Sequence, residues 1–318
     1  MDKGKVKRYA RIYVILALLF VLLIVFNHKL HLLALNVSSF SNDSDIRVLS
    51  MNIHGTGEDF EEREKRILSM IEDEQPSFVY LTEYQDSCSQ MLDSLLQKIY
   101  PSHLRGLNGA YRTECIYSNW SIDSLSDVRL DNENEKVRKY VQESGFVRNH
   151  YSSPTILRCQ ISRGEKMMVL YLCHLESNNY LNEVEDSTLI FHPQLRYYET
   201  LLRAYQNGSM VRELEADALQ EAIEKEKLPV IVIGDFNDFY PSYTLDRLVS
   251  GNPGLLKCAW WEGGFGLGNT FGGSILGLRI DHILYGKGVE ISNIKLGDFG
   301  MSDHRAVIGD FCLSQDSD

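Results

Sequence analysis

The chain lacks closely spaced cysteine pairs, and its six cysteines do not have the spacing of a zinc site. No two of them are separated by only two residues, the spacing that structural zinc sites commonly use. The sequence therefore argues against a zinc finger or ribbon. Buried free thiols are the expected state, although an exported location would permit disulfide bonds that the sequence does not assign. The six positions are Cys88, Cys115, Cys159, Cys173, Cys258 and Cys312.

The chain also lacks internal repeats and low-complexity tracts, which argues against a solenoid or a propeller. It has 318 residues, of which 44% are hydrophobic, enough for a sizeable core. Although this length exceeds the usual size of one domain, sandwiches of two sheets run large. We therefore expect one domain over residues 46–318, preceded by an N-terminal tail.

Positive charge is scarce in the predicted domain. The chain has 32 Lys and Arg against 44 Asp and Glu, a net charge of −12; the first eleven residues carry +4, so the remainder carries −16. Because non-specific binding of nucleic acid needs a basic face, this balance disfavours DNA or RNA as a partner without excluding it. The dense basic stretch 136–139 falls in a polar insert, 123–153, that we predict to be a solvated loop. The composition does not define an oligomeric state.

An uninterrupted apolar run follows a basic N-terminus. Five basic residues lie within the first eleven, and residues 12–26 contain no charged residue. Fifteen apolar residues are short for a spanning helix, but the run resumes at 30–35, so we predict a transmembrane signal-anchor over 1–37 with one interfacial break. The positive-inside rule places the N-terminus in the cytoplasm and the domain outside, joined by a linker over 38–45. The alternative is a signal peptide cleaved near Val37-Ser38-Ser39, which would release a secreted domain.

Apolar runs and their breaks predict a series of strands and helices. Strands are expected at 46–52, 77–82, 113–118, 155–161, 167–173, 229–234, 279–285, 290–295 and 304–312. Helices are expected at 60–74, 88–99, 194–226 and 242–250, the third of them broken at Asn207-Gly208-Ser209. Residues 261–277 contain seven glycines and are expected to form a loop beside the site.

Polar residues suited to metal or phosphate chemistry stand where several predicted strands end. Asp235 follows the apolar run 228–233 and lies two residues before Asn237, so both side chains face one side of an extended strand end. Carboxylates hold hard cations, and an imidazole moves protons near neutral pH. Because such residues recur, the sequence predicts one shared pocket above the sheet edges. The others are Asn52, Glu83, His174, Asp281 and the triplet Ser302-Asp303-His304.

Six short motifs together resemble the endonuclease/exonuclease/phosphatase superfamily, which includes pancreatic deoxyribonuclease, apurinic endonucleases and neutral sphingomyelinases. The resemblance covers roughly residues 46–313. It implies an α/β fold, a four-layer sandwich of two mixed β-sheets flanked by helices, with the site at one end. The motifs are Met51-Asn52-Ile53-His54-Gly55, Leu81-Thr82-Glu83, Cys173-His174-Leu175, Gly234-Asp235-Phe236-Asn237, Arg279-Ile280-Asp281-His282 and Ser302-Asp303-His304.

The expected metal ligand is Glu83, with Asn52 and Asp303 completing or supporting its shell. Glu83 is an acidic residue that ends a hydrophobic strand, which agrees with the role that the resemblance implies. Mg²⁺ needs only one or two carboxylates besides water. The expected cofactor is therefore Mg²⁺, with Mn²⁺ as a substitute.

The resemblance implies catalytic roles for five further residues. Asp235 and Asn237 would orient the attacking water and contact the phosphate. Asp281 would fix the tautomer of His304, which would either activate the water or hold the phosphate, so that the base is Asp235 or His304. His174 would protonate the leaving oxygen or bind the scissile phosphate.

Two more residues near the motifs are candidate substrate contacts, and a third is expected to be structural. The chain has Tyr111-Arg112-Thr113-Glu114 where the family has small residues, which makes Arg112 a candidate substrate contact. Asn269, in Asn269-Thr270-Phe271, resembles a loop that precedes the Arg-Ile-Asp motif and is the second candidate. His282 should face away from Asp281 and is expected to be structural.

These observations predict a metal-dependent phosphoesterase that hydrolyses a phosphodiester or phosphomonoester by water attack at phosphorus. A tethered acidic domain favours lipid head groups or small organophosphates as substrates, and a nuclease acting on DNA or RNA is the alternative. A second alternative is a non-catalytic binding protein that kept the fold. Its mark would be the loss of a metal ligand or of the His-Asp pair, and the sequence retains both.

Overall fold

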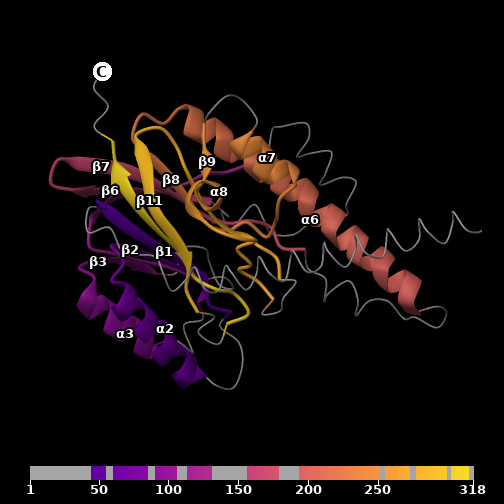
Figure 1. Cartoon of the computed structure of the whole chain (residues 1–318), viewed down its shortest axis with the longest axis horizontal. Coiled ribbons are helices and arrows are strands. Elements are labelled where there is room, and N and C mark those ends of the chain that lie inside the picture. Colours follow the sequence, from indigo (N-terminus) through magenta and orange to yellow (C-terminus); the bar gives the residue numbers. More distant parts are fainter. Residues whose placement is uncertain are drawn as a thin grey trace, which may run out of the picture.

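Two six-stranded sheets pack face to face and carry helices on their outer sides (Figure 1). The computed structural model describes residues 44–54, 60–84, 90–105, 113–130, 156–178, 193–250, 255–272, 277–298 and 302–314. The predicted anchor, residues 1–37, lies outside these ranges, as does most of the linker. Among the helices of the described ranges, none is both long and apolar enough to cross a membrane.

Sheet A is mixed. Its strand order is β11 (Val289–Leu296), β12 (Val307–Leu313), β1 (Ile46–Asn52), β2 (Phe78–Tyr84), β4 (Thr113–Ser118) and β3 (Ser102–Arg105). β1 and β2 run parallel, and the other neighbours run antiparallel. The first and last strands of the chain, β1 and β12, are thus neighbours within this sheet.

Sheet B repeats this plan. Its strand order is β5 (Ser121–Asp127), β6 (Ile156–Arg163), β7 (Lys166–His174), β8 (Val230–Asp235), β10 (Asp281–Tyr285) and β9 (Lys257–Cys258). Here β7 and β8 are the parallel pair, and the other neighbours are antiparallel. Each sheet thus has one parallel pair whose carboxyl ends can carry a site.

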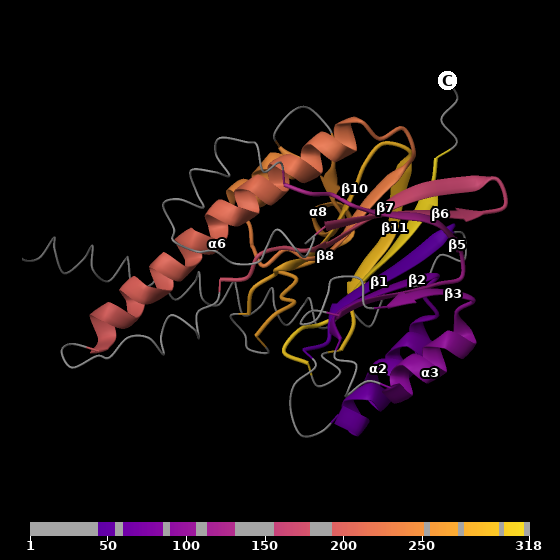
Figure 2. The same cartoon turned by 180° about the vertical axis from the view of Figure 1, so that it is seen from behind.

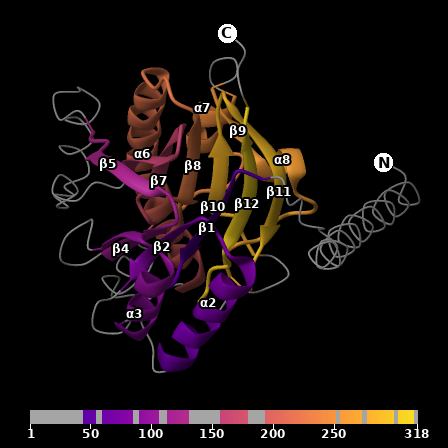
Figure 3. The same cartoon turned by 90° about the vertical axis from the view of Figure 1, so that its left-hand side faces the viewer.

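Helices form the two outer layers (Figures 2 and 3). α2 (Phe60–Glu74) and α3 (Gln90–Ile99) cover the outer face of sheet A. α6 (Pro193–Glu224) and α7 (Tyr243–Val249) pack on the outer face of sheet B. α8 (Ala259–Gly263) lies beside β10 and β11.

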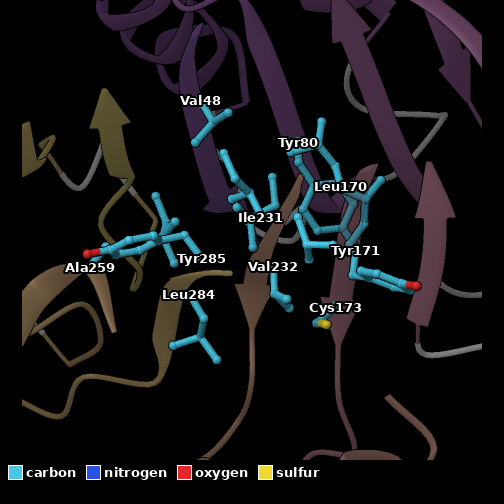
Figure 4. Close-up of a cluster of buried hydrophobic side chains, with 14 of the residues drawn as sticks. Val48, Tyr80, Leu170, Tyr171, Cys173, Ile231, Val232, Ala259, Leu284 and Tyr285 are labelled. Atoms are coloured by element: carbon cyan, nitrogen blue, oxygen red, sulfur yellow. The ribbon is translucent and has the colours of Figure 1, made fainter. Parts of the chain in front are cut away.

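The alternation of side chains along each strand divides the core into layers. On β1, Val48 joins the cluster between the sheets, whereas its neighbour Leu49 packs against α2 and α3. Between the sheets, Val48 and Tyr80 of sheet A lie toward Ile231 and Leu170 of sheet B (Figure 4). A residue of even number at the end of β1, such as Asn52, therefore faces the space between the sheets.

The structure confirms the predicted sandwich of two mixed sheets flanked by helices, and it corrects some elements. The sequence analysis missed β3, β5 and the two-residue β9, all of which are edge strands. β5 occupies the start of the insert predicted as a loop, and most of its side chains are exposed. An edge strand that buries little surface has no clear alternation of hydrophobic residues in its sequence. β5 can therefore be recognised only from its pairing with β6.

The predicted break in the long helix is also wrong, because α6 runs unbroken through Gly208. A Cβ at Gly208 would lie 2.8 Å from Asn178 Oδ1 and 3.2 Å from the carbonyl oxygen of Ser177. The glycine therefore permits close packing of α6 on the segment after β7 rather than ending the helix. The glycine-rich stretch 261–277 begins inside α8, so its first turn is helical rather than a loop.

Candidate active site

The carboxyl ends of the two parallel strand pairs meet at one end of the sandwich. In sheet B, His174 at the end of β7 pairs with Asp235 at the end of β8. β10 begins at the same level, with Asp281 opposite Asp235. In sheet A, Asn52 at the end of β1 reaches across to Asp235. The topology therefore gathers side chains that are far apart in the sequence.

Three residues at this end adopt a left-handed backbone conformation, with φ of 41° at His54, 56° at Glu83 and 49° at Asn237. Residues other than glycine adopt this conformation rarely, and they keep it where the surrounding structure holds them. At Gly234, φ is 138° and a Cβ would lie 1.9 Å from the carbonyl oxygen of Cys173, so only glycine fits. The strained positions coincide with motif residues.

The amide of Asn52 joins Glu83 to Asp235 and so links the two sheets. Its Nδ2 donates to Glu83 Oε1 at 3.0 Å and to Asp235 Oδ2 at 3.1 Å. His174 Nε2 lies 3.6 Å from Glu83 Oε1. Although burial raises the pKa of Glu83, the neighbouring His174 and the hydrogen bond from Asn52 outweigh burial and hold this pKa well below its usual range. Glu83 is therefore a carboxylate at neutral pH.

His304 and Asp281 form a buried pair. His304 Nδ1 lies 2.9 Å from Asp281 Oδ2. The backbone N–H of Asp281 donates to Thr270 Oγ1, and that of His304 donates to Ser302 Oγ, each at 3.0 Å, which fixes both residues. Burial disfavours the charged imidazole, but the carboxylates of Asp281 and Asp235 raise the pKa of His304 to about 10. His304 is therefore a cation at neutral pH, with its Nε2 3.9 Å from Asp235 Oδ2.

Asp235 is buried at the centre of this group. Its Oδ1 accepts a hydrogen bond from the backbone N–H of Asn237 at 2.8 Å, which closes a turn after β8. Burial raises the pKa of Asp235, and the negative charge of Asp281 adds to the effect. Asp235 is thus a stronger base than an ordinary aspartate. Asn237 Nδ2 donates to the carbonyl oxygen of Leu175 at 2.9 Å, which ties its amide to the segment after β7.

A second carboxylate stands behind His174, and our sequence analysis did not assign it. Glu114 Oε1 lies 3.9 Å from His174 Nδ1, and the hydroxyl of Tyr80 donates to Glu114 Oε2 at 2.7 Å. All three residues are buried. Glu114 shares the inward face of β4 with Ile116, and a carboxylate at a core-facing strand position is the signal that could have identified it. Each of the two site histidines thus has an acidic partner.

Glu83 and Asp303 present their carboxylates around one imidazole. His54 Nδ1 lies 3.3 Å from Glu83 Oε2 and 4.0 Å from Asp303 Oδ1. The Glu83 side chain is 36% exposed and that of Asp303 is 44% exposed, so both can bind a cation that keeps several of its waters, as Mg²⁺ does. These two carboxylates fit a hard divalent cation.

Both ends of the Asn52 amide form hydrogen bonds within the site. Its Oδ1 accepts the backbone N–H of His54 at 3.0 Å, while its Nδ2 faces Glu83 and Asp235. In this orientation Asn52 supports the Glu83 carboxylate. A further set of donor atoms, from Asp235, Asp281 and His304, lies within 4.8 Å of one another. Because Asp281 and His304 already bond to each other, this set is suited to proton chemistry.

Of the other residues singled out in the sequence, some fall outside the described part of the chain and the rest are buried beside the site. Arg112 and the basic stretch 136–139 fall outside the described residues. Asn269 is buried next to Thr270, whose hydroxyl holds the backbone of Asp281. His282 Nε2 lies 3.0 Å from the carbonyl oxygen of Asp238, and burial, with the charge of Arg279, lowers the pKa of His282 to about 3. A neutral, buried His282 agrees with the structural role expected for it.

The loop that follows β8 is tied to the outer helices. Asp238 is buried and lies 3.3 Å from the guanidinium Nε of Arg212, a fully buried residue of α6. Thr244 Oγ1 of α7 donates to Asp238 Oδ2 at 2.8 Å. The segment that begins at Asp235 is thus held from both the sheet and the helices, which fixes the side chains of the candidate site.

Comparison with known proteins extends these observations. The sequence model of a family described as the Endonuclease/Exonuclease/phosphatase family matches residues 34–304. No curated protein matches the chain in sequence.

Several solved structures share the fold. Truncated TDP2 of Caenorhabditis elegans has a TM-score of 0.57 and 18% identity, covering 84% of this chain and 97% of that one. The human Nocturnin catalytic domain has a TM-score of 0.57 and 17% identity, covering 85% and 94%. The 3′ phosphatase NExo from Neisseria, solved with a product DNA hairpin, has a TM-score of 0.55 and 13% identity, covering 84% and 99%. At these identities the likeness concerns the fold.

Proposed function

The chain belongs to the endonuclease/exonuclease/phosphatase family, whose members are hydrolases of phosphoester bonds, and we propose that it hydrolyses a phosphodiester or a phosphomonoester by water attack at phosphorus. The observation that carries this proposal is the buried His304–Asp281 pair beside Asp235, joined through Asn52 to the carboxylate of Glu83. This arrangement combines a base, a cation and a metal-binding carboxylate at one end of the sandwich.

We assign a separate role in catalysis to each of Asp235, His304 and His174. Asp235, whose pKa burial raises, accepts a proton from the attacking water. His304, protonated at neutral pH, donates a hydrogen bond to a non-bridging oxygen of the phosphate rather than acting as the base. We assign to His174 the transfer of a proton to the leaving oxygen, and the Glu114 carboxylate behind it supports this role. This division favours Asp235 over His304 as the base.

Members of this family typically depend on a divalent metal. We propose that Glu83 and Asp303 hold Mg²⁺, or Mn²⁺ in its place, and that Asn52 orients the Glu83 carboxylate. A cation bound there would neutralise negative charge on the phosphate oxygens.

The favoured substrates are lipid head groups or small organophosphates, because the domain carries a net charge of −16 beyond its first eleven residues. A nuclease or nucleic-acid phosphatase is the second candidate, and the fold shared with NExo, a 3′ phosphatase solved with product DNA, supports it. A purely binding role has less support, since the structure brings the predicted metal-binding and catalytic side chains together.

The test is an assay of the full chain, purified in mild detergent, against a panel of phosphoesters. The panel contains phospholipids in mixed micelles, soluble nitrophenyl phosphoesters, and DNA and RNA oligonucleotides, each with Mg²⁺, with Mn²⁺ or with EDTA. We expect metal-dependent turnover of at least one lipid or small phosphoester, with activity lost in EDTA and restored by excess Mg²⁺. Turnover of oligonucleotides alone would establish the second candidate, and no turnover of any phosphoester would favour a binding protein.

We also propose that residues 1–37 anchor the chain in a membrane, with the domain on the extracytoplasmic side. The basic flank before residue 12 and the apolar run after it support this orientation. A periplasm-type reporter such as alkaline phosphatase, fused after Asp318, should be active, and a reporter that folds only in the cytoplasm should be silent. The reverse pattern would place the domain in the cytoplasm and make intracellular nucleic acid a better substrate.

A further inference from the structure

Exposed aromatic side chains of the described residues gather in two segments beside the candidate active site. Four of the exposed large hydrophobic residues are aromatic, and all four lie between 240 and 265. Exposed hydrophobic residues scattered singly are normal on a protein surface, whereas a group in one region marks an interaction site. We define the apolar rim as Tyr240, Trp261, Phe265, Leu267 and Leu278, whose exposed fractions run from 41% to 52%.

The rim is held in place by close packing. The rings of Tyr240 and Trp261 meet edge to face with centroids 4.8 Å apart, so the two segments touch. Beneath them, Trp260 is buried, and its Nε1 donates to the carbonyl oxygen of Gly266 at 3.0 Å. The chain after α8 therefore curls around the Trp260 ring.

Two glycines make this curl specific. A Cβ at Gly264 would lie 2.5 Å from the Trp260 ring, and one at Gly268 would lie 2.4 Å from it. No larger residue fits at either position without displacing that ring. The glycines therefore face inward, and Phe265 and Leu267 between them are exposed. The packing of the two glycines against Trp260 is therefore the reason why Phe265 and Leu267 point to solvent.

The rim is continuous with the catalytic residues. The backbone of Leu278 pairs with that of Phe271, with hydrogen bonds of 2.9 Å and 3.1 Å. The Phe271 ring lies 4.9 Å from that of His304. Tyr240 follows Asp235 by five residues in the loop after β8. A surface that covers the rim would therefore bring its own groups next to His304.

The charge around the rim indicates the kind of surface that fits it. From 261 to 278 the sequence has one charged residue, Glu262, and no Lys, Arg or His. Arg279, which follows, stacks its guanidinium 5.9 Å from the Trp261 ring centre. A nucleic-acid surface needs clustered cations, which this segment lacks. Trp, Tyr, Phe and Leu with few charges are instead typical of side chains that enter the interface of a lipid bilayer.

We propose that the apolar rim docks on a zwitterionic lipid surface, so that the phosphate of a lipid head group enters the site at His304. The outward-facing cation of a zwitterionic head group suits an acidic domain, whereas an anionic lipid surface would repel it. This inference rests on the proposed phosphoesterase function, since it names the substrate class of that same site.

Tryptophan fluorescence can test the docking directly, because the chain contains three tryptophans and only Trp261 is exposed; Trp120 and Trp260 are buried. The full chain is reconstituted into phosphatidylcholine vesicles with and without bromine on the upper acyl carbons. We expect a blue shift and bromine quenching of the emission. Trp261→Phe, measured in parallel, should remove the quenched component and so assign it.

A double variant, Phe265→Ser with Leu267→Ser, tests the rim as a unit. It should lower the quenched fraction by roughly threefold or more, because two large apolar side chains no longer leave water on docking. It should also raise KM for phospholipid in vesicles while leaving KM for a soluble nitrophenyl phosphoester unchanged. Met167→Ser is the matched control, since Met167 is 47% exposed at the start of β7, the end opposite His174.

The outcomes separate this inference from the proposed function. No quenching by brominated lipid, with turnover of soluble phosphoesters intact, would overturn lipid docking alone. Quenching without turnover of any phosphoester would support docking and overturn the proposed function. Quenching of Trp261 by added oligonucleotides but not by brominated vesicles would replace the lipid surface with nucleobases and overturn the inference.

Discussion

Replacing Glu83 by Gln is expected to lower kcat/KM for a phosphoester by roughly two orders of magnitude or more, the scale of losing the main electrostatic element of a site. The variant keeps the shape of the side chain and its contact with Asn52 but removes the charge that would hold Mg²⁺. Steady-state kinetics at saturating Mg²⁺, together with Mg²⁺ titration by calorimetry, measure the two effects. Metal binding should be lost in parallel with turnover.

The fold should survive this substitution, since the Glu83 side chain is 36% exposed and belongs to a strand end rather than to the core. Far-UV circular dichroism and the thermal midpoint should match those of the unmodified chain. Glu61→Gln is the matched control, because Glu61 is a 76% exposed glutamate of α2 that pairs only with Lys65 among the described ion pairs. Near-normal turnover of Glu83→Gln, or full activity of the unmodified chain in EDTA, would show that Glu83 does not hold an essential metal.

His304→Ala is expected to have an effect of similar size, and Asp281→Asn should add little to it. Residues that act as one unit are strongly non-additive, so the double variant should be nearly as active as His304→Ala alone. The 2.9 Å contact between His304 Nδ1 and Asp281 Oδ2 is the reason for treating them as a unit. A double-variant cycle in kcat/KM measures the coupling. Independent, multiplicative losses would assign Asp281 another role.

The pH profile gives a second readout of the same pair. The pKa of His304 is raised to about 10 from an ordinary value of 6.5, so the cationic form persists through neutral pH and is lost as the pH rises through about 10. Activity that needs this cation should therefore fall on the alkaline side near pH 10. Asp281→Asn should move that fall toward pH 6.5, because it removes the charge that opposes the effect of burial.

Asp217→Asn serves as the control for this profile, since Asp217 is a half-buried carboxylate on α6 that pairs with Arg247. Its alkaline limb should coincide with that of the unmodified chain. An activity that instead rises with pH through the neutral range, as neutral imidazole forms, would make His304 the base and contradict the role proposed for Asp235.

Features that depend on local pattern could be predicted before the structure was known. Buried central strands such as β8 show as apolar runs, and a polar residue that ends such a run is visible without a structure, which is how Asp235 and Glu83 were found. The family's motifs added the two-sheet architecture, and the structure confirms it. The order of these motifs along the chain also pointed to one common site.

Features that arise between distant segments depend on the tertiary structure. β5 is a strand because β6 pairs with it, and α6 continues through Gly208 because the segment at 177–178 packs against that glycine. Glu114 belongs to the site because β4 holds it behind His174. The apolar rim is exposed because Trp260 packs against two inward-facing glycines, Gly264 and Gly268. Local sequence determines whether a residue suits a strand, a turn or a ligand. Which groups meet, and therefore their pKa values and chemistry, depends on contacts between residues far apart in the chain.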